Sequence, residues 1–156
     1  MYMHLPSNYE DNEVLQMLIE EEMDRLGISL VSVFNLGEKL GLHLEGMLGL
    51  FLGIFSHHQT ANYFYKNDLK VVVDILLLEA TNLPVESVNR AKYLAIMYQL
   101  LMNCTDYVYI LHKQEEILVL TEALQDDPLL HPEARQASRR IVENCRGLLS
   151  LDPADL

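Results

Sequence analysis

The sequence predicts an all-α domain, and three observations support this. Half of the 156 residues are hydrophobic, while glycine and proline are scarce, so the chain has enough apolar side chains for a core. Apolar residues recur at i, i+3, i+4 and i+7 in successive segments, the spacing of one helical face. Glycine or proline stands at several segment ends, as at Gly27 and Pro84. We expect a loose lead over residues 1–12, one helical domain over 13–150 and a tail over 151–156.

The first two predicted helices cover residues 13–26 and 29–40. Asn12 can cap the first helix, because its side-chain oxygen can accept a hydrogen bond from a free N–H of the first turn. One side of this helix is apolar, and the other side carries Glu20, Glu21, Glu22 and Asp24. The second helix has a weaker apolar side, made of Leu30, Val33, Phe34 and Leu40.

Residues 42–55 predict a third helix in spite of three glycines. Each glycine costs about 1 kcal/mol relative to alanine inside a helix. No other turn residue interrupts the segment, however, and it is longer than most strands. A turn is predicted over 56–60, where Ser56 or Thr60 can cap a short helix that carries Tyr63, Phe64 and Tyr65.

The strongest helical pattern covers residues 68–82, and we expect the rest of the chain to be organised around this helix. Asn67 or Asp68 can cap it, and Pro84 stops it. Its wide apolar face is formed by Leu69, Val72, Val73, Leu76, Leu77 and Ala80. Most of the remaining circumference is also apolar, through Val71, Ile75 and Leu78. A helix of this kind is expected to have neighbours on most sides.

A helix over 86–103, a connection over 104–112 and a helix over 113–125 follow. After a break at 126–128, the last helix covers 132–149, with Pro132 at its first position, where a missing N–H does no harm. The residues expected to face inward are Ala91, Leu94, Ala95, Tyr98, Leu101 and Met102 in the first of these helices, Ile117, Leu120, Thr121 and Leu124 in the second, and Ala134, Ala137, Ile141, Cys145 and Leu148 in the last.

The spacing of the helices predicts how they assemble. The longer ones start near residues 44, 68, 87, 114 and 132. Taken in pairs, they approach the roughly 40-residue unit of armadillo and HEAT arrays. We therefore predict an armadillo/HEAT-like helical repeat stack, in which each unit buries its apolar face on its neighbours.

The chain is acidic, and its charge argues against two classes of partner. The net charge is −12, and residues 1–26 hold seven acidic residues and one basic residue. Nucleic acids and anionic membrane surfaces both require clustered lysine and arginine, so we expect neither partner. The longest apolar run, over 46–55, is about half the length of a membrane-spanning helix. Residues 1–13 are polar and acidic, so no secretory signal is expected.

No pattern indicates catalysis or metal binding. His57 and His58 are adjacent, so they point apart on regular structure, and a solvated turn explains them better than a metal site. No glycine loop of the phosphate-binding type occurs. Cys104 and Cys145 are interpreted as reduced core thiols. We expect no enzyme activity, no cofactor and no small-molecule substrate.

Part of the sequence resembles a known family. The aromatic pair Tyr63-Phe64, followed by Asn67-Asp68-Leu69 and an apolar helix that ends before Pro84, is similar to the leucine-rich armadillo-like domain of the WISH/DIP/Ldb17 family. Further similar segments are 31–40, 51–55 and 93–101, and the resemblance covers roughly residues 31–125.

The resemblance implies a function in the actin cytoskeleton. Members of this family are cytosolic regulators at cortical actin. They bind the actin-related protein 2/3 complex and activate it without a pre-existing mother filament, so that it seeds linear filaments. A second hypothesis, drawn from the fold alone, is a generic armadillo-type scaffold that binds a peptide or a partner helix in a groove.

Two charged sets are the candidate protein-binding residues: Lys66, Lys70 and Asp74 on the central helix, and Arg135, Arg139 and Arg146 on the last helix. The arginines share one face. They form either a solvated face, paired with Glu133 and Glu143, or a docking edge, because arginine is favoured at interfaces. We favour the central-helix set, because it lies inside the region of resemblance.

Overall fold

The structure, a computed structural model, describes residues 30–32, 34, 44–64 and 66–156. The predicted lead over 1–12, the helix over 13–26 and most of the helix over 29–40 lie outside these residues. From residue 44 on, the elements are α3 (Leu44–Ser56), α4 (His58–Ala61), α5 (Lys66–Asn82), α6 (Val88–Asn103), α7 (Tyr107–Ile110), α8 (Gln114–Gln125) and α9 (Pro132–Leu149), followed by the 3-10 turn η2 (Pro153–Asp155). No strand occurs in the described part of the chain, and the all-α prediction is confirmed.

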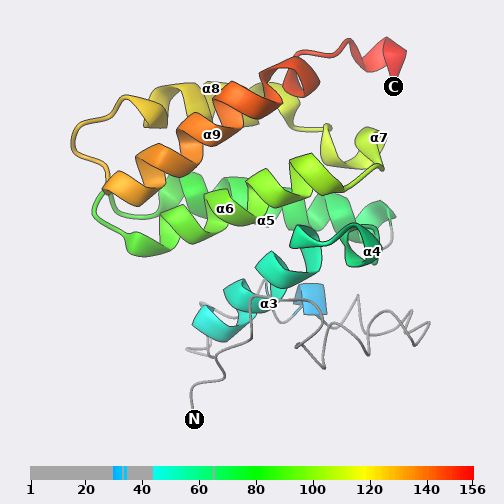
Figure 1. Ribbon diagram of the computed structural model, residues 1–156, viewed down its shortest axis with the longest axis horizontal. Coiled ribbons are helices and arrows are strands. Elements are labelled where there is room, and N and C mark those ends of the chain that lie inside the picture. Colours follow the sequence, from blue (N-terminus) through cyan, green and yellow to red (C-terminus); the bar gives the residue numbers. More distant parts are fainter. Residues whose placement is uncertain (1–29, 33, 35–43, 65) are drawn as a thin grey trace.

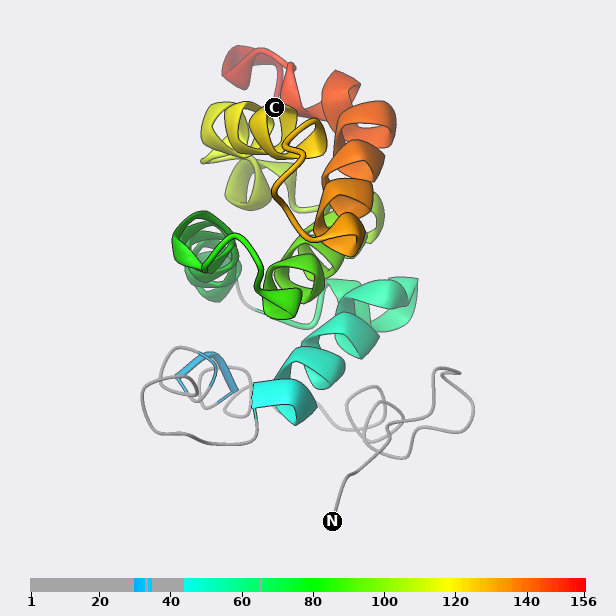
Figure 2. The same ribbon diagram turned by 90° about the vertical axis from the view of Figure 1, so that its left-hand side faces the viewer.

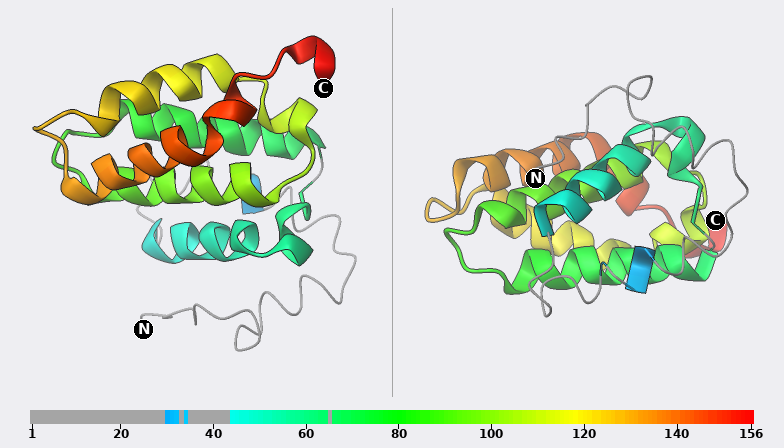
Figure 3. Two further views of the ribbon diagram at one scale, coloured as in Figure 1. Left: turned by 45° about the horizontal axis from the view of Figure 1, so that its top comes forward. Right: turned by 90° about the horizontal axis from the view of Figure 1, so that it is seen from below.

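The helices lie in successive layers (Figures 1 and 2). One layer holds α3, the next holds α5 and α6, and the last holds α8 and α9. The α6 helix packs against α3, α5 and α9, while α8 packs against α9. The views from two further directions agree with this order (Figure 3). The helix with neighbours on most sides is therefore α6, and the prediction that α5 occupies this position is wrong.

The glycine-containing segment forms α3, as predicted, because its aromatic side chains find a shared core. Phe51 stacks on Phe34 with ring centroids 4.2 Å apart and on Phe64 with centroids 5.5 Å apart. Phe55 lies 5.6 Å from Phe64. All four rings are buried. Aromatic pairs contribute beyond the area they bury, which offsets the cost of the glycines.

The segment between α3 and α5 differs from the prediction. The expected turn contains the one-turn helix α4, and Tyr63 and Phe64 lie outside any helix. Phe64 turns into the aromatic cluster, and this burial takes precedence over continuing a helix. Thr60 is buried and caps no following helix, because its hydroxyl donates a hydrogen bond of 2.7 Å to the carbonyl of Ile54.

The α5 helix begins at Lys66 and ends at Asn82. Asn67 and Asp68 therefore lie in its first turn and do not cap it. The predicted apolar face is buried at Leu69, Val72, Val73, Leu76 and Ala80. Val71 and Leu78 are 40% and 56% exposed, so the outward face of α5 is open.

The remaining helices match their predicted ranges closely, with two differences. The expected connection over 104–112 contains the short helix α7. Met102, which is predicted to face inward, is 47% exposed. The core side of α6 is formed by Ala91, Tyr93, Leu94, Ile96, Met97, Leu100 and Leu101. Pro132 occupies the first position of α9, as predicted. No helix of the described part is long and apolar enough to cross a bilayer.

Candidate protein-interaction surface

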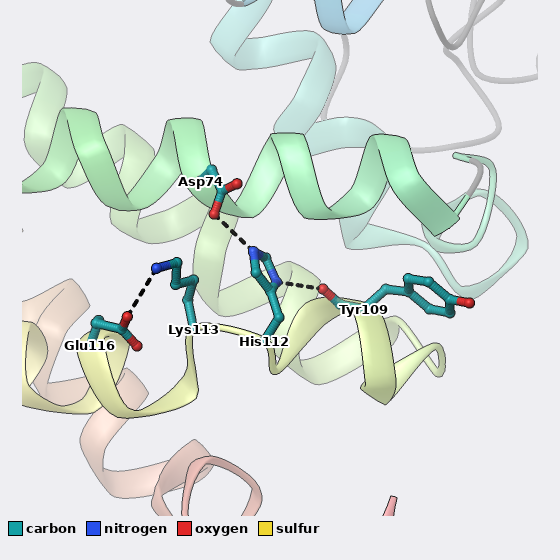
Figure 4. Close-up of polar contacts among 5 residues, drawn as sticks. All are labelled: Asp74, Tyr109, His112, Lys113 and Glu116. Carbon is teal, nitrogen blue, oxygen red and sulfur yellow. Dashed lines mark hydrogen bonds and ion pairs between the residues drawn. The ribbon is translucent and has the colours of Figure 1, made fainter. Parts of the chain in front are cut away.

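The three predicted residues of α5 lie on the side of the helix that faces α7 and the segment before α8. Figure 4 shows Asp74 pointing toward His112. We call Lys66, Lys70 and Asp74 the polar strip. The Asp74 Oδ1 lies 2.8 Å from His112 Nε2, and His112 Nδ1 lies 2.8 Å from the carbonyl oxygen of Tyr109. His112 thus bridges α5 to α7, and Asp74 has its partner inside the chain.

The two lysines of the polar strip share one aromatic ring. The Lys66 and Lys70 ammonium nitrogens lie 5.5 Å and 5.4 Å from the centroid of Tyr109. Such contacts hold a cation over the negative face of a ring. Lys66 is exposed and Lys70 is half-buried, so both charges remain accessible. We call Lys66, Lys70 and Tyr109 the lysine–tyrosine cradle.

Two of the three predicted arginines of α9, Arg139 and Arg146, face α8. Their ion-pair partners are not Glu133 and Glu143, the partners that the solvated-face alternative implies. Arg146 Nη2 lies 2.7 Å from Glu122 Oε1. Arg139 Nη2 lies 4.0 Å from Asp126 Oδ1 and 3.4 Å from the carbonyl of Gln125. Arg135 is half-buried. Arg139 and Arg146 therefore help to hold α9 against α8, and their charges already have partners within the chain.

The structure does not bring the two predicted sets together. The polar strip contacts α7 and the start of α8, whereas Arg139 and Arg146 contact the second half and the end of α8. Tyr109 and His112, which complete the strip, were missed by the sequence analysis. They lie in a segment too short to show a helical period, and the pair Asp74–His112 joins residues 38 positions apart.

The outward face of α5 adds apolar surface beside the polar strip. Val71 and Leu78 are seven positions apart, so they lie on one side of the helix. On α7, Tyr107 and Val108 are exposed as well. Apolar side chains next to lysines and an aromatic ring form a surface that suits a protein partner.

The cysteines and histidines of the described residues form no assembled chemical site. Cys104 and Cys145 are buried and free. Burial raises the pKa of the Cys104 thiol, and it raises the pKa of the Cys145 thiol to about 11. Both thiols are therefore neutral at pH 7 and poor nucleophiles. Within the described ranges, no three His, Cys, Asp or Glu side chains are grouped to hold a metal ion.

The bridge made by His112 leads to a prediction about stability. His112→Ala removes the hydrogen bonds that join Asp74 to α7, and each such bond contributes about 0.5–1.5 kcal/mol. Because the Asp74 side chain is half exposed, each bond should contribute near the lower end of this range. We therefore expect the free energy of unfolding to fall by about 1 kcal/mol in total. Urea unfolding followed by circular dichroism measures it.

The matched control is His58→Ala, a histidine on the exposed side of α4. This change should leave the free energy of unfolding within about 0.5 kcal/mol of wild type. Equal unfolding midpoints for both variants would mean that the bridge contributes nothing.

A layered all-helical fold with a mixed charged and apolar face on α5 suits a protein-interaction domain. The chain belongs to the SPIN90/Ldb17 leucine-rich domain family, whose family model matches residues 1–117. This is a family of protein-interaction domains and not a known enzyme family. No curated protein matches the chain.

The range of the match bears on both candidate sets. It includes the polar strip, Tyr109 and His112, and it ends inside α8, so the arginines of α9 lie outside it. The match also includes residues 1–30, which the resemblance seen in the sequence did not cover. The acidic start of the chain is thus part of the family domain.

Proposed function

We propose that this chain binds the actin-related protein 2/3 complex and activates it without a pre-existing mother filament, so that the complex starts linear filaments. The observation that carries the proposal is the family match over residues 1–117, because the resemblance that connects the sequence with this complex lies in the same region. Such an activity belongs in the cytoplasm, at cortical actin.

The fold proposed for this function is an armadillo-like stack within one domain over residues 13–150, between a lead over 1–12 and a tail over 151–156. The order of layers supports it, because α6 packs on α3 below and on α9 above. In such a stack each helix pair buries one face on its neighbours and leaves another face for partners. The outward face of α5 is available in this way.

The polar strip is the proposed contact with the complex. It lies inside the family match, its two lysines are accessible, and Val71 and Leu78 supply apolar surface beside it. The arginines of α9 are the weaker candidate, because two of them are paired with α8 and all of them lie outside the match.

Lys70→Glu tests this surface. Reversing the charge should leave the fold intact, because Lys70 is half-buried on the surface of α5 and does not belong to the hydrophobic core. Within the chain it removes one cation–π pair, the one with Tyr109. Binding to the purified complex should become several-fold weaker, because the reversed charge slows association or removes an attraction at the interface. Depletion of the complex by immobilised protein, at low and moderate salt, measures the affinity.

The matched control is Arg140→Glu, which makes the same charge change on the exposed side of α9, outside the family match. It should bind as wild type does. Equal affinities of wild type and Lys70→Glu at both salt concentrations would remove the polar strip from the proposal. A pyrene-actin assembly assay with the complex then separates activation from binding.

The second candidate is a generic scaffold that binds a peptide or a partner helix. The open apolar positions on α5 favour it, because a helical partner needs such anchors. Failure of the wild-type chain to retain the complex, with Lys70 intact, would favour this candidate over the first.

A further inference from the structure

The lysine–tyrosine cradle holds two positive charges that the described residues do not neutralise. Lys66 and Lys70 are one helical turn apart, a spacing at which like charges repel, and both lie over the same ring. Among the residues that the structure describes, no carboxylate pairs with either lysine. The ring offsets part of the repulsion, but an opposite charge is missing.

The other two lysines of the described part of the chain have carboxylate partners. Lys92 pairs with Glu45 at 3.3 Å, and Lys113 pairs with Glu116 at 3.0 Å. The carboxylate that helical spacing offers to Lys70 belongs to Asp74, four positions later, but Asp74 faces His112 instead. Arg135 and Arg140 likewise form no ion pair with a described carboxylate. Lys66 and Lys70 differ from them because their two charges lie over one ring.

From this arrangement we propose that the lysine–tyrosine cradle binds an acidic helix of a protein partner, one that presents two carboxylates four positions apart. Each carboxylate meets one of the two ammonium groups, and the Tyr109 ring keeps both lysine side chains extended toward the partner. Asp74 keeps its contact with His112 and thereby positions α7, and so the ring. This inference rests on the proposed function for the location of the surface and adds the chemistry of its ligand.

The spacing supports a helical occupant. Side chains at i and i+4 lie about 5–6 Å apart on a helix surface, so carboxylates at i and i+4 of a partner helix match Lys66 and Lys70. Val71 and Leu78, on the neighbouring outward side of α5, offer apolar contact to the same helix. Lysine side chains already held against a ring lose less conformational freedom on binding.

The experiment uses a helical alanine-based peptide with glutamates four positions apart, and the same peptide with glutamines. Titration of the labelled full chain is followed by amide NMR shifts. We expect saturable shifts around Lys66, Lys70 and Tyr109 with the glutamate peptide, weaker binding at higher salt, and no shifts there with the glutamine peptide. Shifts spread over other lysines and arginines, or absent, would overturn the proposal.

Variants give the second measurement. Lys66→Gln with Lys70→Gln should bind the glutamate peptide about tenfold more weakly, whereas Lys66→Arg with Lys70→Arg keeps both charges and should bind nearly as wild type. The matched control, Lys92→Gln with Arg140→Gln, removes two charges elsewhere and should bind as wild type. Tyr109→Phe should retain binding and Tyr109→Leu should weaken it, because only the former keeps an aromatic face.

The same variants separate this proposal from the proposed function. If wild type binds the glutamate peptide in the cradle but not the actin-related complex, the acidic-helix inference stands and the proposed function is wrong. If wild type binds the complex and the Lys66→Gln, Lys70→Gln variant binds it equally with the same salt dependence, the proposed function stands and this inference is wrong.

Discussion

Leu76→Ala is expected to lower the free energy of unfolding by about 2–5 kcal/mol, the range for a buried leucine whose removal leaves a cavity. Leu76 is 0% exposed and belongs to the continuous core. It lies in the middle of the buried face of α5, between Val72 and Ala80. Because α5 packs against α6 along this face, the neighbouring helices cannot easily close the space. Chemical denaturation monitored by circular dichroism gives the value.

Leu78→Ala is the control on the same helix. The same atoms are removed, but Leu78 is 56% exposed, so little transfer energy and no cavity are involved. We expect a change below about 1 kcal/mol. A larger loss for Leu78→Ala than for Leu76→Ala would show that α5 is rotated from the orientation described above.

Arg90→Met is expected to give the second large effect, a loss of about 2 kcal/mol or more. Arg90 is 4% exposed. Its Nε donates to the carbonyl of Ala80 at 2.8 Å, and its Nη2 donates to the carbonyl of Leu83. The last carbonyls of a helix have no partner within it, so Arg90 of α6 satisfies the end of α5 and fixes the loop between them.

Burial of the Arg90 charge is unfavourable and opposes the stabilisation that its hydrogen bonds provide. Burial lowers the pKa of the Arg90 guanidinium from its ordinary value, while the nearby Asp127 and Glu86 carboxylates act in the other direction. Methionine removes this desolvation cost but leaves two carbonyls without donors. We expect the second effect to dominate, because charge-assisted hydrogen bonds are the stronger ones. An unchanged or higher melting temperature would show that desolvation dominates instead.

Arg90→Lys separates charge from geometry. Lysine keeps the positive charge, but its single ammonium group lacks the planar fork that reaches both carbonyls. A stability between those of wild type and Arg90→Met is expected, measured in the same denaturation series. If Arg90→Lys equals wild type, the fork contributes nothing beyond charge.

The proposed binding surface lies in the part of the chain that the family match covers, whereas α9 lies outside that part. The family match covers α3 to α7 and stops inside α8. The pairing of Arg146 with Glu122 and the approach of Arg139 to Asp126 show that α9 packs on α8. The working surface proposed above therefore lies on α5 and α7, and α9 supports the layer behind them.

The sequence by itself determined the longer helices of this protein, but not the short helices α4 and α7. The ranges of α3, α5, α8 and α9 follow from apolar residues at helical spacing and from breakers such as Pro84, Pro128 and Pro132. These are local signals, carried by residues within a few positions of one another. The family was recognised in the same way, from the order of side chains around Asn67-Asp68-Leu69. Lys70 and Asp74 were found because they are polar residues in an otherwise apolar helix, and Lys66 because it lies at the start of that helix.

Only the tertiary structure decided which helix lies at the centre and which charges are free. That α6 is enclosed and α5 is open on one side depends on how whole faces match, which no single segment encodes. Phe64 lies outside its predicted helix because its ring is buried against the rings of Phe51 and Phe55. Asp74 contacts His112, which is 38 positions away in the sequence. Lys70 lies over the Tyr109 ring instead of pairing with Asp74. Such pairings are long-range, and their energies of about 1 kcal/mol each are realised only after the helices have packed.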